Sequence, residues 1–198
     1  MVLLKQHTAM VYRLETMKLK AVGLILFLLS CRKNMKTEEI NQDPKPSKIY
    51  HSSTPNGKIG KEEAQKLLDS ILPFAETMLA KYGEFHPYGG ATTPKGDIIN
   101  IGADDGKGDK DRQSSDLIDF LQKGLRAGAE ENKYTSTAVV YDVVVKLPSN
   151  KQSDAIAVNL DHKLGYSAVV YLPYKLENGK VEFGEMQLAQ GAGDIFRM

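Results

Sequence analysis

The stretch that decides the fold reads TSTAVVYDVVVKL and runs from Thr135 to Leu147. β-branched side chains dominate it, and alternation of this kind predicts a β-strand with two distinct faces. One face holds Val139, Tyr141, Val143, Val145 and Leu147, and the other holds Ala138, Val140, Asp142 and Val144. We interpret it as the first strand of a β-rich final third of the chain.

Three more strands are predicted after this one, separated by short turns. They cover Asp154–His162, Tyr166–Leu176 and Val181–Leu188, and Gly184 in the last is a candidate bulge. The turns fall at Pro148–Asn150, Lys163–Gly165 and Asn178–Gly179. Because Asn-Gly is a strong signal for a type I′ hairpin, the pattern predicts an antiparallel meander.

Upstream of the meander, apolar residues recur at three- and four-residue spacing in two segments, which predicts two helices. The first covers Lys61–Tyr82, with Gly83 suited to the position after its end. Pro73 lies inside it and predicts a kink or a break into two short helices. The second begins at Ser114 or Ser115 and runs to about Glu130.

Two short strands, Glu84–Thr93 and Ile98–Gly102, are predicted between these helices. The full order is α-β-β-α-β-β-β-β, which predicts an α+β domain over residues 61–198. We expect an antiparallel sheet of five to six strands with two or three helices packed on one face.

The chain before this domain begins with a segment typical of secretion. Residues 17–31 read MKLKAVGLILFLLSC: two lysines, a short apolar run and a small residue before the cysteine. This is the layout of a signal peptide, and the apolar run is too short to span a bilayer. The end of the run, Leu28-Leu29-Ser30-Cys31, resembles the lipobox of bacterial lipoproteins. That resemblance implies cleavage before Cys31 and a lipid on its sulfur.

Cys31 is the only cysteine in the chain, so no intrachain disulfide can form. Acylation would remove a thiol that is a liability in an oxidising compartment. We expect a signal peptide over residues 1–30, with Met17 as an alternative start. The proline- and serine-containing residues 31–60 are then predicted to form a disordered, lipidated tether.

Charge separates the segments further. The whole chain has a net charge of +1. Counting by segment, the tether is basic and the predicted domain is acidic. The domain has no basic stripe with interleaved aromatic residues, so we expect no nucleic acid partner.

One glycine-rich loop contains four carboxylates. Carboxylates are the usual ligands of calcium, but their spacing here does not match a known calcium-binding pattern. The four carboxylates are Asp104, Asp105, Asp109 and Asp111. The EF-hand pattern fails because Lys107 takes a ligand position and Lys110 takes the position of the required glycine. We interpret the segment as a solvated loop and expect no metal and no cofactor.

Four residues are candidates for ligand binding: His86, Tyr88, Asp142 and His162. His86 and Tyr88 lie among glycines that would allow close approach of a ligand, although a twisted edge strand explains the same pattern and is the interpretation we favour. Asp142 interrupts a run of valines, and with His162 or His86 in one cavity it would form an acid/base site. The alternative, which we favour, is a partly wet face of the sheet. We assign no catalytic residue, because no nucleophile elbow, zinc helix, P-loop or dinucleotide pattern is found.

A longer stretch resembles a family. Residues 74–90, FAETMLAKYGEFHPYGG, resemble a helix-to-strand junction in uncharacterised small bacterial α+β proteins. Ser153-Asp-Ala-Ile, Leu160-Asp-His and Tyr171-Leu-Pro-Tyr-Lys175 resemble the same group. The resemblance implies no activity.

We therefore expect a lipoprotein of the bacterial cell envelope, held outside the cytoplasm by a lipid on Cys31, with a non-catalytic binding or structural domain. A protein partner is one expectation for that domain. Two alternatives stay open: an immunity-type inhibitor of a protein toxin, and an uncharacterised enzyme with a site near His86, Asp142 and His162.

Overall fold

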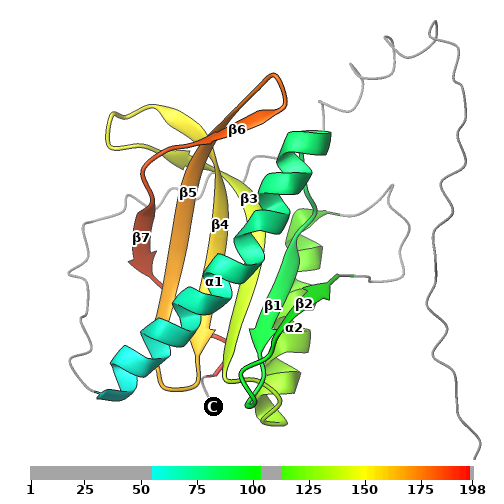
Figure 1. Cartoon of the computed structure of the whole chain (residues 1–198), viewed down its shortest axis with the longest axis vertical. Coiled ribbons are helices and arrows are strands. Elements are labelled where there is room, and N and C mark those ends of the chain that lie inside the picture. The colour runs from blue at the N-terminus through cyan, green and yellow to red at the C-terminus, as the bar shows by residue number, and fades with distance from the viewer. Residues whose placement is uncertain (1–54, 104–112, 197–198) are drawn as a thin grey trace, which may run out of the picture. The chain divides into compact units, whose positions relative to one another are not determined.

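A seven-stranded antiparallel sheet forms the centre of the domain in the computed structural model, which describes residues 55–103 and 113–196 (Figure 1). Two helices flank it, α1 (Pro55–Tyr82) and α2 (Ser114–Glu130). The strands are β1 (Tyr88–Thr92), β2 (Ile98–Gly102), β3 (Ser136–Lys146), β4 (Gln152–His162), β5 (Ser167–Glu177), β6 (Lys180–Phe183) and β7 (Gln187–Gln190). The predicted α+β class and antiparallel sheet are confirmed.

The strands pair in the order β2-β1-β3-β4-β5-β6, and β7 also pairs with β5. The predicted last strand, Val181–Leu188, is two strands, which raises the count to seven. Pro173 on β5 explains the interruption. Its carbonyl accepts a hydrogen bond from Gly184 N at 2.7 Å, but its nitrogen has no hydrogen to donate in return, so the ladder breaks there.

The two helices pack on opposite faces of the sheet, so the expectation that they share one face is wrong (Figure 1). α1 covers the face that carries Val140, and α2 covers the face that carries Val139. The physical reason lies in β3, which is apolar on both sides. Each side must be removed from water, and each therefore requires its own cover.

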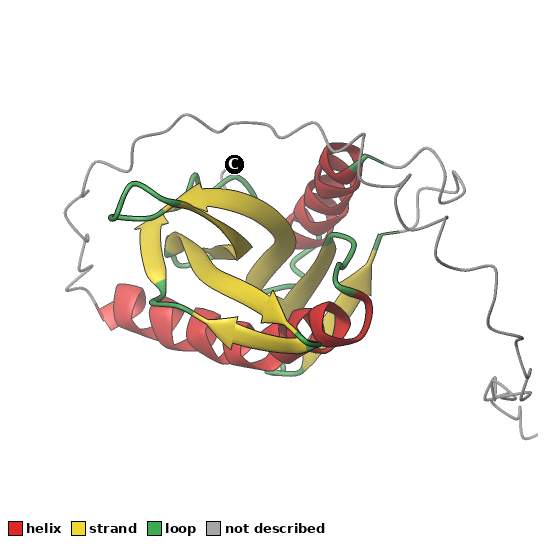
Figure 2. Ribbon diagram, turned by 90° about the horizontal axis from the view of Figure 1, so that it is seen from above, coloured by secondary structure: helices red, strands yellow, loops and turns green. Residues whose placement is uncertain are grey.

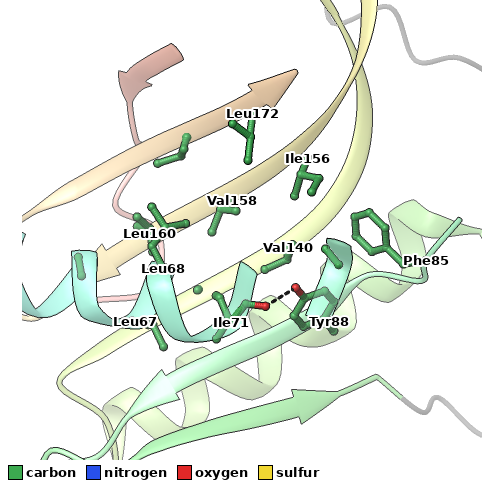
Figure 3. Packing of buried hydrophobic residues seen from close by; sticks show 14 of the residues in the cluster. Leu67, Leu68, Ile71, Phe85, Tyr88, Val140, Ile156, Val158, Leu160 and Leu172 are labelled. Atoms are coloured by element: carbon green, nitrogen blue, oxygen red, sulfur yellow. Dashed lines mark hydrogen bonds between the residues drawn. The ribbon is translucent and has the colours of Figure 1, made fainter. Parts of the chain in front are cut away.

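The long strands curve over α1, and most of the core lies between them (Figure 2). Leu67, Leu68 and Ile71 of α1 are almost completely buried there. Burial of each such side chain contributes roughly 1.5–3 kcal/mol. Tyr88 closes this core by donating a 2.8 Å hydrogen bond to the carbonyl oxygen of Ile71 (Figure 3).

α1 is a single helix of 28 residues, so the predicted break into two helices at Pro73 is wrong. Pro73 lies on the exposed side of α1, where the helix loses one backbone hydrogen bond but water can replace it. The helix also begins at Pro55, six residues before the predicted start at Lys61. Residues 55–60 are thus the first residues of α1.

The turns follow their local chemistry. Gly83 has a φ of 77°, and its N–H bonds to the carbonyl oxygen of Leu79 at 2.9 Å, which ends α1 as predicted. Asn178 and Gly179 have φ values of 52° and 73°, the left-handed pair that a type I′ hairpin requires.

Several predicted features lie outside the described residues: the signal segment, Cys31, the tether up to residue 54, and the carboxylates at positions 104, 105, 109 and 111. Neither helix of the described ranges is both long and apolar enough to cross a membrane.

Candidate functional site

The structure does not bring the four predicted ligand-binding residues together. Asp142 pairs with Ile156 on β4, whereas His162 pairs with Ser136. Ser136 and Asp142 are six residue steps apart along β3, which is about 20 Å at the usual rise of a strand. An acid/base site that uses both side chains is therefore not formed.

His86 and Tyr88 differ in their surroundings. Tyr88 is 6 % exposed and is bonded to the Ile71 carbonyl, and its ring packs edge-on against Phe74 with centroids 4.9 Å apart. Burial raises the pKa of the Tyr88 hydroxyl, which makes it a core group and not a reactive one. His86 is exposed just before β1.

Asp142 lies on the α1 side of the sheet, where it is half-buried. Tyr174 donates a hydrogen bond to its Oδ1 at 3.1 Å. Burial raises the pKa of Asp142 to about 6, and the nearby charge of Asp154 adds to the rise, while the Tyr174 hydroxyl opposes it. The valine-rich strand thus holds a carboxylate with one neutral hydrogen-bond partner from β5.

His162 forms the second site, at the other end of the sheet. Its side chain is completely buried, and Nε2 lies 3.0 Å from Glu63 Oε2 of α1. Nδ1 accepts a 3.0 Å hydrogen bond from the backbone N–H of Leu164. Since Nδ1 is an acceptor, the proton of the neutral ring is on Nε2, and His162 donates it to Glu63.

Glu63 is held by two donors on the same oxygen. Besides His162, the Thr135 hydroxyl donates to Glu63 Oε2 at 3.1 Å. The hydrogen bond from His162 is the largest cause that lowers the pKa of Glu63, and the charge of Lys163 acts in the same direction. Glu63 is therefore a carboxylate whose position is set by buried groups, although about a third of its side chain, 36 %, remains exposed.

This arrangement depends on a close approach of α1 to the turn between β4 and β5. Gly60 lies on α1 against the His162 ring, and a Cβ atom there would be 3.0 Å from Nδ1. A side chain at this position would require the ring or the neighbouring Tyr166 Cβ to shift by a few tenths of an ångström. The glycine, one turn before Glu63, is thus part of what positions the carboxylate.

An open pocket of about 280 Å³ adjoins Glu63. α1 contributes Glu63 and Lys66, and the turn between β1 and β2 contributes Thr93 to Gly96. Thr135, the residue just before β3, lines the pocket as well. The complete lining is Glu63, Lys66, Thr92, Thr93, Pro94, Lys95, Gly96, Ile98 and Thr135. We call it the Glu63 pocket.

The turn that forms one wall of the Glu63 pocket is tightly bonded. Thr93 N donates to the carbonyl oxygen of Asp97 at 2.8 Å, and Gly96 N donates to the carbonyl oxygen of Thr93 at 2.9 Å. Gly96 has a φ of 89°, which glycine adopts without strain. The wall that carries Lys95 is therefore set by backbone hydrogen bonds before any ligand arrives.

The ring of His162 supports Glu63 but is not itself available to a ligand of the Glu63 pocket. Both ring nitrogens of His162 are engaged, so the imidazole is a support for Glu63 and has no free nitrogen for a substrate. Within residues 55–103 and 113–196, no group of three or more His, Cys, Asp or Glu side chains is arranged to hold a metal ion. What the pocket offers is a carboxylate, two ammonium groups and several hydroxyls.

Sequence reasoning identified His162 but missed Glu63, Lys66 and Lys95. Glu63 and His162 are 99 residues apart, so no local pattern links them. The two lysines lie on an exposed helix and in a turn, where lysine is common.

Comparison with known proteins adds no relative. No protein-family model, no curated protein and no solved structure matches this chain.

Proposed function

We propose that this protein is a lipid-anchored binding module of the bacterial cell envelope, and that its folded domain holds a small polar ligand in the Glu63 pocket. The observation that carries the binding half is the carboxylate of Glu63, which two donors fix on one oxygen while the side chain stays partly open to the pocket. Because the charged group is already fixed in a concave site, ligand binding loses little free energy to ordering its side chain.

The anchoring half rests on the sequence from Met17 to Cys31. Its apolar run and the Leu28–Cys31 motif support cleavage before Cys31 and a lipid on the sulfur. Two acyl chains at one cysteine, beside a basic tether, supply the two signals that stable membrane attachment requires. The membrane is therefore the first partner that we propose, on the outer side of the cytoplasmic membrane or at the cell surface.

Lipidation is tested by growing cells with labelled palmitate and separating membranes from soluble protein. We expect the label on the wild-type chain and a membrane-bound protein, and we expect both to be lost in Cys31→Ser. The matched control is Ser30→Ala, which keeps the cysteine and a small residue at the cleavage site. An unlabelled wild-type chain, or a Cys31→Ser variant that stays in the membrane, contradicts the anchor.

Binding in the Glu63 pocket is tested by NMR on the ¹⁵N-labelled full chain in detergent, with pooled small metabolites. We expect shifts of the amide signals of Thr93, Gly96 and Thr135, and their loss in Glu63→Gln. Shifts that spare these amides, or the absence of any shift, contradict the proposed pocket.

A second candidate function, an immunity-type inhibitor, is favoured by the surroundings of Asp142. This half-buried carboxylate has a neutral partner in Tyr174, and the exposed side chains Val144 and Leu176 are 45 % and 38 % accessible near the same end of the sheet. A basic residue of a partner protein would complement such a carboxylate. Protection of cells that express a neighbouring toxin gene, lost in Asp142→Arg, would support this function.

A further inference from the structure

We infer that the ligand of the Glu63 pocket is a small zwitterion of the amino acid type, whose ammonium group binds Glu63 and whose carboxylate binds Lys66 and Lys95. This inference rests on the proposed binding function and specifies the chemical class of its ligand. It follows from how the three charged side chains are, and are not, paired.

The two oxygens of Glu63 differ in their hydrogen bonds. His162 and Thr135 both donate to Oε2, at 3.0 and 3.1 Å. Oε1 accepts no hydrogen bond from any side chain or backbone group in the described ranges. Glu63 lines the pocket, and a carboxylate with one oxygen that lacks a donor is suited to an ammonium group, because charge-assisted hydrogen bonds are the stronger ones.

Two lysines, Lys66 and Lys95, line the same pocket. Lys66 follows Glu63 by three residues on α1, so the two side chains share one side of the helix. Lys95 faces the same pocket from the turn between β1 and β2. Neither lysine forms an ion pair with a carboxylate of the described residues, so both ammonium groups are available to an anion.

Glu63 and Lys66 line the pocket from α1 and Lys95 lines it from the opposite turn, yet neither lysine forms an ion pair with Glu63 among the described residues. Neither Lys66 nor Lys95 is among the groups that lower the pKa of Glu63; the charges that do so belong to His162 and Lys163. A simple anion would be attracted by the two lysines and repelled by Glu63. A simple cation would be attracted by Glu63 and repelled by the two lysines. A zwitterion satisfies both at once, which is how charge patterns provide specificity.

Size limits the ligand as well. The pocket volume of about 280 Å³ corresponds to the liquid volume of roughly nine water molecules. That space suits a molecule with about as many non-hydrogen atoms, which is the range of single amino acids. Thr92, Thr93 and Thr135 complete the polar part of the lining.

The experiment is isothermal titration of the full chain in detergent with three probes of nearly equal shape. L-alanine carries both charges, propionate lacks the ammonium group and ethylamine lacks the carboxylate; the other neutral protein amino acids are titrated beside L-alanine. We expect the best amino acid to bind at least tenfold tighter than either singly charged probe. We expect Glu63→Gln and Lys95→Gln each to weaken that binding at least tenfold.

Lys61→Gln is the matched control, because Lys61 is an exposed lysine of α1 outside the pocket lining, and it should bind as wild type does. Lys95→Gln changes only an exposed side chain, so it keeps the test valid even if Glu63→Gln lowers stability. If propionate or ethylamine binds as tightly as every amino acid does, the inference of a zwitterionic ligand is wrong. The proposed ligand-binding function of the pocket is not contradicted by that result. Failure of all amino acids to bind also overturns the inference, and the metabolite NMR experiment then decides whether the pocket function fails with it.

Discussion

Replacing Asp142 by asparagine is expected to stabilise the protein at neutral and alkaline pH. Asparagine has nearly the same shape as aspartate, and its side-chain oxygen can still accept the hydrogen bond that Tyr174 donates. The change therefore removes the charge and little else. Most single substitutions destabilise a protein, so a gain at this position is an unusual result to expect.

The size of the gain follows from the pKa of Asp142. Burial raises it from an ordinary value of 3.8 to about 6, so the folded state binds the proton more tightly than the unfolded state does. Above pH 6 the folded protein must therefore hold a charge that burial disfavours. A rise of roughly two pH units at 1.36 kcal/mol each makes this cost about 3 kcal/mol. The cost fades as pH falls from 6 to 4, because the folded carboxyl group takes up its proton there.

The assay is urea unfolding of wild type and Asp142→Asn at pH 8 and at pH 4. We expect the variant to be up to about 3 kcal/mol more stable at pH 8, with an unchanged dependence on urea, and within about 0.5 kcal/mol of wild type at pH 4, where the carboxyl group of the unfolded chain is still partly ionised. Asp154→Asn is the matched control. Asp154 is an exposed carboxylate on the neighbouring strand, so its replacement should add only the small gain that comes from relieving Asp142.

The reasoning is refuted if Asp142→Asn is less stable than wild type at pH 8. It is also refuted if the difference between the two proteins is the same at both pH values, because a gain that does not titrate cannot come from the carboxylate.

Two further predictions concern the helices. In α2, Gly124→Ala should stabilise the protein by about 1 kcal/mol, because a Cβ at this position contacts no other atom and alanine favours a helix. Gly128→Ala should destabilise the protein by roughly 1–3 kcal/mol, because its Cβ would overlap the Tyr134 ring. Thermal unfolding of both variants measures the difference, and equal effects would contradict this packing. In α1, the lowered pKa of Glu63 contributes stability that is present above its ordinary value of 4.5 and lost as pH falls through the folded value. Glu63→Gln should therefore be less stable than wild type at pH 7, and the difference in stability between the two proteins should narrow towards pH 3. Acid titration followed by circular dichroism measures this difference. A difference that stays constant with pH would show that His162 does not stabilise the ionised form of Glu63.

Much of the fold follows from local patterns, because its strands and turns depend on neighbouring residues. The hairpin at Asn178–Gly179 and the end of α1 at Gly83 are local chemistry, and both are confirmed. The side of the sheet that α2 covers is a different matter. Both faces of TSTAVVYDVVVKL carry apolar residues, and no local pattern says which helix covers which face. The expectation that both helices share one face, which would leave Asp142 on a partly wet face, is therefore wrong: α1 covers the face of Asp142 and α2 covers the other.

The candidate site is harder to predict because its parts are distant in the chain. Asp142 stands out among valines, but its partner Tyr174 is 32 residues away and lies two strands across the sheet. Glu63 gave no signal at all, since a glutamate near the start of a helix is common. His162 was selected for a site with Asp142, and the register of β3 with β4 keeps the two apart.

The core has a consequence for the order in which the chain can fold. The side chains that α1 buries pack mainly against β3, β4 and β5, which begin at Ser136 and end at Glu177. During synthesis α1 therefore leaves the ribosome well before the surface that covers it exists. The meander, by contrast, needs only its own short turns to form, and nearby contacts form fastest. We expect the meander to assemble first and α1 to dock last, so a chain cut before β5 should remain unfolded and open to proteases and chaperones.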